Sequence, residues 1–437
     1  MTPVKNAPRH CVTRLLAGLT LAFVCTAQAA PDQALSLEAA LAHATASHPD
    51  LRQAEAQGAL ARADALYAAS LDDFQVNLEG SLRTGRNALT DDKFEPDHIL
   101  RLNARKTLWD GGRIEAGSRA AKLESAGREA LLLETRAQRR LGLMARFFDV
   151  LLADLRYAAD DEAMAVAYVS WDNARERHQL GELTTPALAE LEARFQDSRL
   201  SRNDSLRRAK EKRALLATAM NRPGELPAEL IDPDLKGNDR PLPEFEPLLR
   251  AMLSHNPRLI ALRQQVAATG ARLDAVTSET QPSLEFEAEA AAYSRESYTR
   301  DTLRAGFNLV WPLFPGGQVD ARKARELAQA QLLQAQVDAQ QLTLRQALFE
   351  AREEILHLRD TERRAADINV TYRDWALERA RAEYELEMKT NLGSGMAETQ
   401  AAKLRRRAVE YRMALAWEKL EALLGTPLDS LPTEPKK

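Results

Sequence analysis

Hydrophobic residues follow two different spacings along this chain. In four short segments apolar and polar residues alternate one by one, whereas in the long segments between them apolar residues recur every three or four positions. Alternation with period two is typical of a strand with one apolar face, and the wider spacing is typical of an amphipathic helix. The pattern therefore predicts a mainly α protein with a small number of strands.

The alternating segments fall at residues 74–83, 100–108, 284–291 and 302–313. Each is roughly ten residues long, which is the length of a transmembrane β-strand. A soluble hairpin that lies on a core gives the same alternation, so one hairpin alone does not decide between the two. The polar stretch from Thr84 to Asp97 separates the first two strands, and four strands are expected in the chain.

The alternation assigns two faces to these strands. In the second strand the apolar row ends at Leu108. The apolar face, which would form the outside of a barrel, is expected to carry Phe74, Leu78, Leu102, Phe286, Phe307 and Trp311. The opposite face, which would line a charged and hydrated lumen, is expected to carry Arg101, Arg105, Glu285, Glu287, Glu289 and Arg304.

The helical segments come in a repeated order. Each strand pair is preceded by a helix of about half length, at residues 36–70 and from about 247 to 277, the second of these broken at Asn256-Pro257. Each pair is followed by a long helix and a shorter returning helix, expected at 112–180 with 187–220, and at 317–390 with 397–424. The first long helix would span on the order of 100 Å, and the opening helix (36–70) and the returning helix (187–220) each cover about half of that length, so these two can stack end to end beside it.

A five-residue motif marks both places where a strand gives way to a long helix. Leu108-Trp109-Asp110-Gly111-Gly112 is echoed by Leu313-Phe314-Pro315-Gly316-Gly317. A glycine pair lets the backbone turn sharply without a Cβ penalty, so Gly111, Gly112, Gly316 and Gly317 are expected at sharp corners. The chain is thus expected to hold two repeats, at 30–221 and 248–427, joined by a proline-rich linker at 222–247 and followed by a tail at 428–437.

The first 29 residues have the composition of a secretory signal. Basic residues precede the apolar run from Leu15 to Val24, and Ala27-Gln28-Ala29 follows it. An uncleaved anchor is the alternative, but the run is too short to span a bilayer. Cys25 also suggests a lipoprotein cysteine, although Phe23 and Val24 are poor neighbours for lipid attachment.

Cleavage of this signal would change both the cysteine content and the charge. Both cysteines, Cys11 and Cys25, would be removed, so packing and not disulfides would stabilise the mature chain. Its net charge would be about −7, which argues against nucleic acid as a partner. No tight histidine cluster, phosphate-binding glycine loop or nucleophile motif is present, so we expect no enzyme activity, no metal site and no cofactor.

The two corners, the duplicated order of elements, the Asn256-Pro257 pair and the ending Gly425-Thr426-Pro427 resemble the TolC-type outer-membrane efflux proteins. The resemblance covers the chain from about Leu35 to Pro427. It implies a homotrimer with a twelve-stranded barrel in the outer membrane of a Gram-negative bacterium and a coiled-coil α-helical tunnel across the periplasm. It also implies a periplasmic adaptor (membrane fusion) protein and an inner-membrane transporter as partners, in an efflux or type I secretion system.

Part of this architecture is expected without the resemblance. Four strands cannot close a membrane barrel, because known barrels begin at eight, so strands of several copies must combine. Three copies would give twelve strands and four would give sixteen; the resemblance implies three. The alternatives are a periplasmic coiled-coil adaptor and a soluble coiled-coil scaffold. The transported substrate, whether drug, metal ion or protein, is not evident from these patterns.

The periplasmic helix turns are the candidate working site, because the resembling family closes its tunnel and docks adaptors there. The matching turns are Leu180 to Thr185 and Leu392 to Met396, and the candidate residues are Gly181, Glu182, Thr184, Glu190, Gly393, Gly395 and Glu398. The family's aperture aspartates have no counterpart directly after Gly393; Glu398 and Glu190 are the nearest carboxylates. Each glutamate either belongs to a cation-selecting ring or is an ordinary first-turn residue near the start of a helix.

Overall fold

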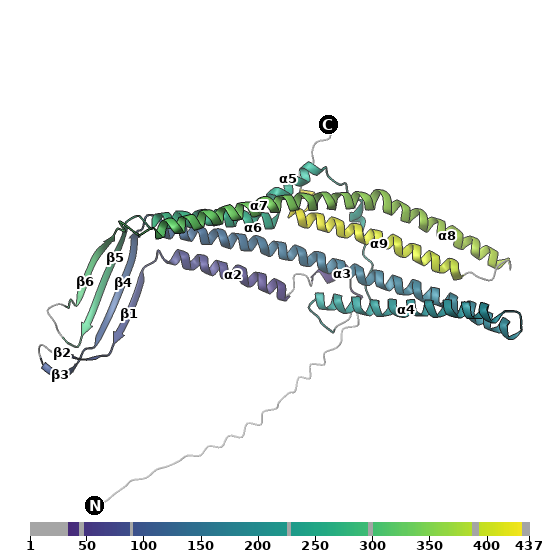
Figure 1. Cartoon of the computed structure of the whole chain (residues 1–437), viewed down its shortest axis with the longest axis horizontal. Coiled ribbons are helices and arrows are strands. Elements are labelled where there is room, and N and C mark those ends of the chain that lie inside the picture. Colours follow the sequence, from purple (N-terminus) through teal and green to yellow (C-terminus); the bar gives the residue numbers. More distant parts are fainter. Residues whose placement is uncertain are drawn as a thin grey trace, which may run out of the picture.

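The computed structural model describes residues 34–42, 48–87, 91–224, 229–295, 300–386 and 393–430. The expected signal peptide, Leu392 and most of the C-terminal tail lie outside these ranges. The molecule is elongated, with the strands at one end and the helices running away from them (Figure 1). Across the described residues, no helix is both long and apolar enough to cross a membrane.

The main sheet has four antiparallel strands that come from both repeats. They are β1 (Gln75–Ser81), β4 (Ile99–Trp109), β5 (Ser283–Tyr293) and β6 (Leu303–Val310), in the order β1-β4-β5-β6. The β4–β5 pairing therefore joins the two repeats, and β1 and β6 form the two edges of the sheet.

Two expectations about the strands are wrong, and one irregularity was not expected. The polar stretch from Thr84 to Asp97 holds a second hairpin, β2 (Thr84–Asn87) with β3 (Asp91–Pro96), so the described residues form six strands and not the four expected. Polar residues dominate both strands and Phe94 is 72% exposed, so no apolar face announces them. β6 ends at Val310, before Trp311 and Pro312, since proline cannot donate to a strand ladder. A bulge between Thr107 and Trp109 leaves Leu108 without a partner on β5.

Near the sheet, four helices form a layer that repeats the strand order. They are α2 (Pro49–Ser70), α3 (Arg113–Gln179), α6 (Pro257–Ser278) and α7 (Gln318–His357). α2 and α6 lead into β1 and β5, whereas β4 and β6 lead into α3 and α7. α3 packs against α2 and α6, and α6 packs against α7, so α2 and α7 are the edges of the layer.

Beyond the middle of the molecule the layer has other members around the same long helix. α4 (Thr185–Ala219) and α9 (Gly393–Leu424) both pack against α3, and α8 (Arg363–Glu385) packs against α9. The edges of this half are α4 and α8 (Figure 1). The helix expected to run unbroken over 317–390 is interrupted by a π-helical turn, η2 (Leu358–Glu362), between α7 and α8. This turn holds one residue more than an α-helical turn.

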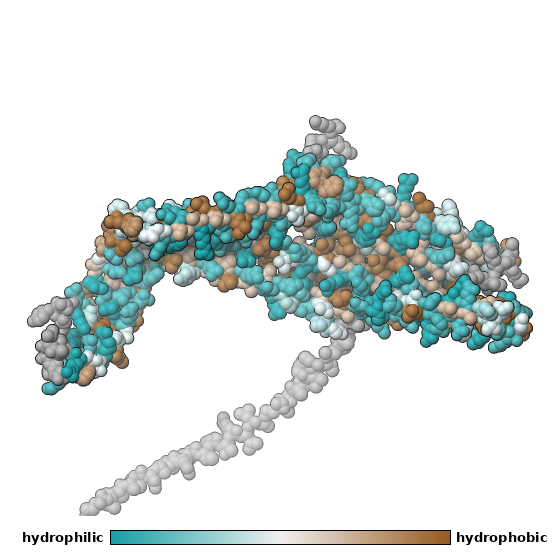
Figure 2. All heavy atoms as spheres, viewed as in Figure 1, coloured by the Kyte–Doolittle hydropathy of each residue, from teal (hydrophilic) through white to brown (hydrophobic). Residues whose placement is uncertain are grey.

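The core lies in the middle, where the short helices α1 (Leu37–Ala42), η1 (Lys236–Asp239), α5 (Phe245–His255) and η3 (Leu428–Ser430) join the long ones. One cluster of buried side chains includes Phe147, Phe148 and Leu216, and a second includes Leu348 and Trp417. Tyr411 stacks on Phe148 with ring centroids 4.6 Å apart, which ties α9 to α3. Figure 2 shows hydrophobic side chains gathered in this central region, whereas most of the visible helical surface is hydrophilic.

The segment between the repeats is attached to α9. Leu230 forms a parallel β-bridge with Leu35. Asp232 accepts a hydrogen bond from the hydroxyl of Tyr411 at 2.7 Å and pairs with Arg407. Further along, the amide of Asn238 donates to a Glu410 carboxylate oxygen at 2.8 Å. The residues expected to form a linker therefore act as a strap across the centre of the molecule.

Two motifs that are distant in sequence meet at the end of α9. The Asn256 side chain accepts from the amide of Leu259 at 3.0 Å, which caps α6, and donates to the carbonyl of Leu423 at 2.9 Å. Gly425, in a left-handed conformation with φ 71°, lies directly against the His255 carbonyl. The Asn256-Pro257 and Gly425-Thr426-Pro427 motifs thus form one junction between α5, α6 and α9.

Candidate channel surfaces

The sheet has one polar and one apolar face. The register places Gln75, Arg105, Glu287 and Gly306 side by side across the four strands, and it places Leu78, Leu102, Ala290 and Leu303 side by side three positions away. Because neighbouring residues of a strand point to opposite faces, these two rows lie on opposite sides. All six residues expected on a lumen face share the first side: Arg101, Arg105, Glu285, Glu287, Glu289 and Arg304.

Ion pairs cross the strands on the polar face. Arg105 lies 2.9 Å from Glu287, and the largely buried Glu289 contacts Arg304 at 2.8 Å and Arg101 at 3.0 Å. These pairs neutralise most of the local charge while the face itself stays polar. Such a surface favours contact with water over contact with lipid.

The apolar face is exposed in the single chain, and it holds one cation that the alternation did not predict. Phe74, Leu78 and Phe307 are each more than 60% exposed. Lys106 shares their side of the sheet, near its helical end, where it donates to the backbone carbonyl of Asp72 and lies 3.4 Å from the Asp72 carboxylate. The lysine therefore turns toward the polar helix end and does not remain among the apolar side chains.

Both glycine corners have the left-handed backbone expected for them. Gly111 and Gly112 have φ values of 69° and 83°, and Gly316 and Gly317 have 67° and 78°. At the first corner, the Asp110 carboxylate accepts from the amides of Gly112 and Ile114 at 3.0 and 2.8 Å. The second corner has Pro315 in place of this aspartate, so it lacks that carboxylate cap.

At the far end, the α3–α4 turn is closed by backbone hydrogen bonds. Gly181 has φ 78°, and the amides of Gly181 and Glu182 donate to the carbonyls of His178 and Arg177. This pair of backbone hydrogen bonds around a left-handed glycine is a Schellman motif, which ends the helix. Thr184 is the N-cap of α4, although its side chain forms no capping hydrogen bond.

The α8–α9 turn differs from the expectation. Gly393 and Gly395 do not lie in a turn; they begin α9, which starts four residues earlier than predicted. Their lack of side chains permits close packing, since a Cβ on Gly393 would overlap Val166 of α3 and a Cβ on Gly395 would lie 3.3 Å from Leu377 of α8. Neighbour contacts and not turn geometry explain these glycines.

The two candidate carboxylates are both paired with arginine. Glu398 contacts Arg373 of α8, and Glu190 contacts Arg194 one turn along α4. A paired carboxylate has less charge to offer to a passing cation. These contacts favour two locally paired glutamates over a charged ring, but the structure places both residues in the second turn of their helices and not in the first turn that was expected.

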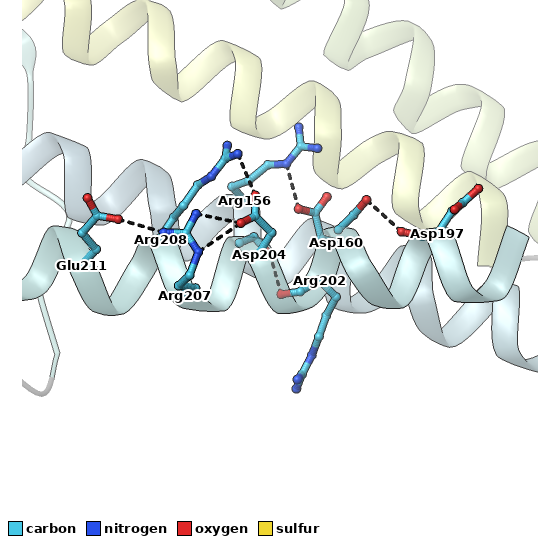
Figure 3. A network of polar contacts seen from close by, with 10 residues as sticks. Arg156, Asp160, Asp197, Arg202, Asp204, Arg207, Arg208 and Glu211 are labelled. Atoms are coloured by element: carbon cyan, nitrogen blue, oxygen red, sulfur yellow. Dashed lines mark hydrogen bonds and ion pairs between the residues drawn. The ribbon is translucent and has the colours of Figure 1, made fainter. Parts of the chain in front are cut away.

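The surface of α4 shows the same local pairing (Figure 3). Asp204 contacts Arg207 at 2.8 Å and Arg208 at 2.7 Å, and Arg207 also reaches Glu211 at 3.2 Å. The hydrogen bond from Arg207 lowers the pKa of the Asp204 carboxyl below its ordinary value. Among the described residues, no group of three or more potential metal ligands comes together.

Comparisons with known proteins agree with this geometry. Residues 248–426 match the family model described as outer membrane efflux protein. No curated protein sequence matches the chain. The fold is that of the TolC-type channels, and the family description agrees with the expected localisation in the outer membrane.

Three solved structures illustrate the shared fold. CusC is 18% identical, with a TM-score of 0.73 over 89% of this chain and 92% of that one. CmeC from Campylobacter jejuni is 15% identical, with a TM-score of 0.71 over 89% and 85%. VceC from Vibrio cholerae is 17% identical, with a TM-score of 0.70 over 90% and 96%. The resemblance expected from the corner motifs is therefore confirmed.

Proposed function

We propose that this protein is the outer-membrane channel of a multi-component efflux or type I secretion system and that it works as a homotrimer. The observation that carries the proposal is that one chain forms an open layer with two complementary edges. β1, α2 and α4 form one edge, and β6, α7 and α8 form the other.

The sheet edges are suited to closing a ring. Because the chain contributes four antiparallel strands, β6 runs opposite to β1, so β6 of one copy can pair with β1 of the next in the same antiparallel pattern. Closure would also remove both unpaired edges, which are otherwise a liability. Three copies would give a barrel of twelve strands, with the apolar face toward lipid and the polar face toward the lumen.

The helical edges support the same closure. Large apolar side chains that would be unfavourable in water gather on the edge helices. On one edge they are Leu60, Leu66, Tyr67 and Leu200; on the other they are Leu327, Leu332, Leu342, Ile368, Tyr372 and Trp375, each at least 50% exposed. Pairing of these edges would bury both rows and continue the helical layer into a closed tunnel.

The remaining parts of the proposal concern transport. The charged and internally paired polar face suits passage of hydrated substrates without tight binding. CusC, which shares the fold, forms a transmembrane channel. By the resemblance to the TolC-type family, a periplasmic adaptor and an inner-membrane transporter would meet the helix turns around Gly181 and at the start of α9.

Disulfide crosslinking tests ring closure directly, because a chain without its first 29 residues contains no cysteine. Cysteine would be placed on β1 at Val76 or Leu78 and, in the same chain, on β6 at Ala305 or Phe307, all on the apolar face. At least one of the four combinations should give covalent trimers on oxidation in outer-membrane fractions.

The matched control is a cysteine pair at Leu102 and Ala290, which face each other within one chain. It should crosslink without any increase in mass. If all four edge combinations remain monomeric while the control pair oxidises, closure through β6 and β1 is refuted. Recovery of the protein in the soluble periplasmic fraction would refute the channel proposal itself.

A further inference from the structure

A cavity of about 510 Å³ lies where α2 begins and α4 ends, with α3 as its floor. It is remote from the sheet and from the helix turns. Its lining includes His48, Asp50, Thr135, Arg139, Arg146 and Thr218. Two of these side chains are arginines, one is a histidine and one is acidic, whereas the chain as a whole has a negative net charge.

Arg139 is the central group. Its side chain is only 10% exposed, yet its nearest carboxylate oxygen, on Asp50, is 3.6 Å away and belongs to a side chain that is 65% exposed. One terminal nitrogen donates to the carbonyl of Ala219 at 3.0 Å, and Nε has no hydrogen-bond partner among the described residues. A buried guanidinium is normally fully paired, with charge-assisted contacts of about 2.7–2.9 Å. Among the described residues, the one carboxylate paired with this guanidinium is therefore farther away than in an ordinary charge-assisted contact.

Arg146 adds a second positive charge. It donates to the backbone carbonyl of Leu215 at 3.2 Å, and Asp50 is the one carboxylate among the described residues that line the cavity. Burial lowers the pKa of the Arg139 guanidinium, the charge of Asp50 opposes this effect, and the charge of Arg146 adds to it. One aspartate thus faces two arginines.

The start of α2 adds donors without adding charge. His48 caps the helix, and its Nδ1 accepts from the amide of Asp50 at 3.2 Å. Burial, followed by the charge of Arg139, lowers the pKa of His48, so the ring is neutral at neutral pH and Nε2 carries the hydrogen. The N-terminal end of a helix of 22 residues also presents a positive dipole to the cavity.

We propose that this cavity binds one oxyanion, a carboxylate or phosphate group, between Arg139 and Arg146. The planar fork of each guanidinium suits two-oxygen ligands of this kind. Two sources have this chemistry. One is a free inorganic anion. The other is a carboxylate of a second copy, because α2 and α4 form one edge of the layer; this second source rests on the proposed function.

The test measures binding of inorganic phosphate to the purified full-length protein in detergent, by equilibrium dialysis in a chloride buffer. The expected result is one phosphate per chain. Arg146→Gln should weaken binding by about tenfold or more, since one charge-assisted contact is lost. Arg146→Lys should restore part of the affinity because it keeps the charge. Arg139→Gln should abolish binding, but Arg146, which is exposed, decides the question if that variant does not fold.

Arg136→Gln is the matched control. Arg136 lies on the same helix three residues before Arg139, is 48% exposed and is paired with Glu55 outside the cavity. It should bind phosphate like the unaltered protein. Equal loss of binding in Arg136→Gln and Arg146→Gln would overturn the assignment, because it would reflect general surface charge.

A second readout distinguishes the two sources. If a carboxylate of a second copy fills the cavity, the oligomer binds no phosphate, and Arg146→Gln but not Arg136→Gln or Arg146→Lys lowers its dissociation temperature by several degrees. If neither phosphate binding nor this selective loss of oligomer stability is seen, the proposal is wrong. The phosphate arm does not depend on trimer formation, so its failure is separable from failure of the channel proposal.

Discussion

Replacement of Gly425 by alanine tests the junction between the end of α9 and the α5–α6 connection. Gly425 ends α9 with φ 71°, and a Cβ there would overlap the His255 carbonyl oxygen and lie 2.9 Å from Pro257 Cδ. Gly181 ends α3 with a similar φ of 78°, but nothing lies within 4 Å of its added Cβ. The two glycines therefore share backbone strain and differ in neighbour contact.

The expected magnitudes follow from this difference. A left-handed conformation costs a residue with a Cβ about 1–2 kcal/mol, and both variants incur this cost. At Gly425 the overlap is with backbone atoms, which cannot rotate away, and overpacking of this kind adds about 1–3 kcal/mol. Gly425→Ala should therefore lower the free energy of unfolding by about 2–5 kcal/mol and Gly181→Ala by about 1–2 kcal/mol.

The assay is urea unfolding of each purified protein in the same detergent, followed by far-ultraviolet circular dichroism at one fixed protein concentration. A fixed concentration is required because association contributes to the apparent stability of an oligomer. Equal midpoints for the two variants, with equal slopes, would refute the reasoning, because they would mean that the contact with His255 has no energetic cost.

Three further outcomes are expected. Asn256→Ala should destabilise the protein by about 1–3 kcal/mol in the same urea assay, because the buried side chain both caps α6 and donates to the Leu423 carbonyl. Asn256→Asp keeps the accepting oxygen and should cost less stability. Equal losses of stability in the two variants would contradict this division of roles. Burial and the hydrogen bond to Asp232 raise the pKa of Tyr411 above its ordinary value of 10.0, so its contribution to stability is present below pH 10 and is lost as pH rises further. Between pH 9 and 11 the melting temperature should therefore fall more steeply for the unaltered protein than for Tyr411→Phe. Parallel curves would exclude a contribution of the protonated Tyr411 to stability. Glu398→Ala should leave cation block of single-channel conductance in planar bilayers unchanged, because Arg373 already pairs with this carboxylate. Weaker block in the variant would support the interpretation that Glu398 belongs to a cation-selecting ring.

The strands of the main sheet and the long helices could be predicted because each has one apolar and one polar face. β4 begins and ends within a residue of the expected 100–108, and α3 within a residue of 112–180. The β2–β3 hairpin carries no such signal, because its strands are mainly polar and the Phe94 side chain is exposed. The bulge at Leu108 was also hidden, since one inserted residue next to a corner does not disturb a short alternation.

The candidate site residues were predictable only where the backbone itself imposed the residue type. The corner glycines follow from the local sequence, because a left-handed backbone favours glycine wherever it occurs. Gly393 does not, since the reason for it is Val166 on a helix more than 200 positions earlier. The cavity between Arg139 and Arg146 likewise depends on the meeting of α2 and α4, which no local pattern records.

The π-helical turn between α7 and α8 gives one continuous helical rod two different contact faces. Each residue of an α-helix advances the side-chain direction by about 100°, so the extra residue rotates everything after Glu362 by about that angle relative to α7. Before the turn the rod packs mainly on α6, and after it the rod packs on α9. A single inserted residue therefore rotates the apolar side of the rod, which lets the second repeat change the helices it packs against. In the first repeat the uninterrupted α3 keeps its apolar side in one direction from end to end.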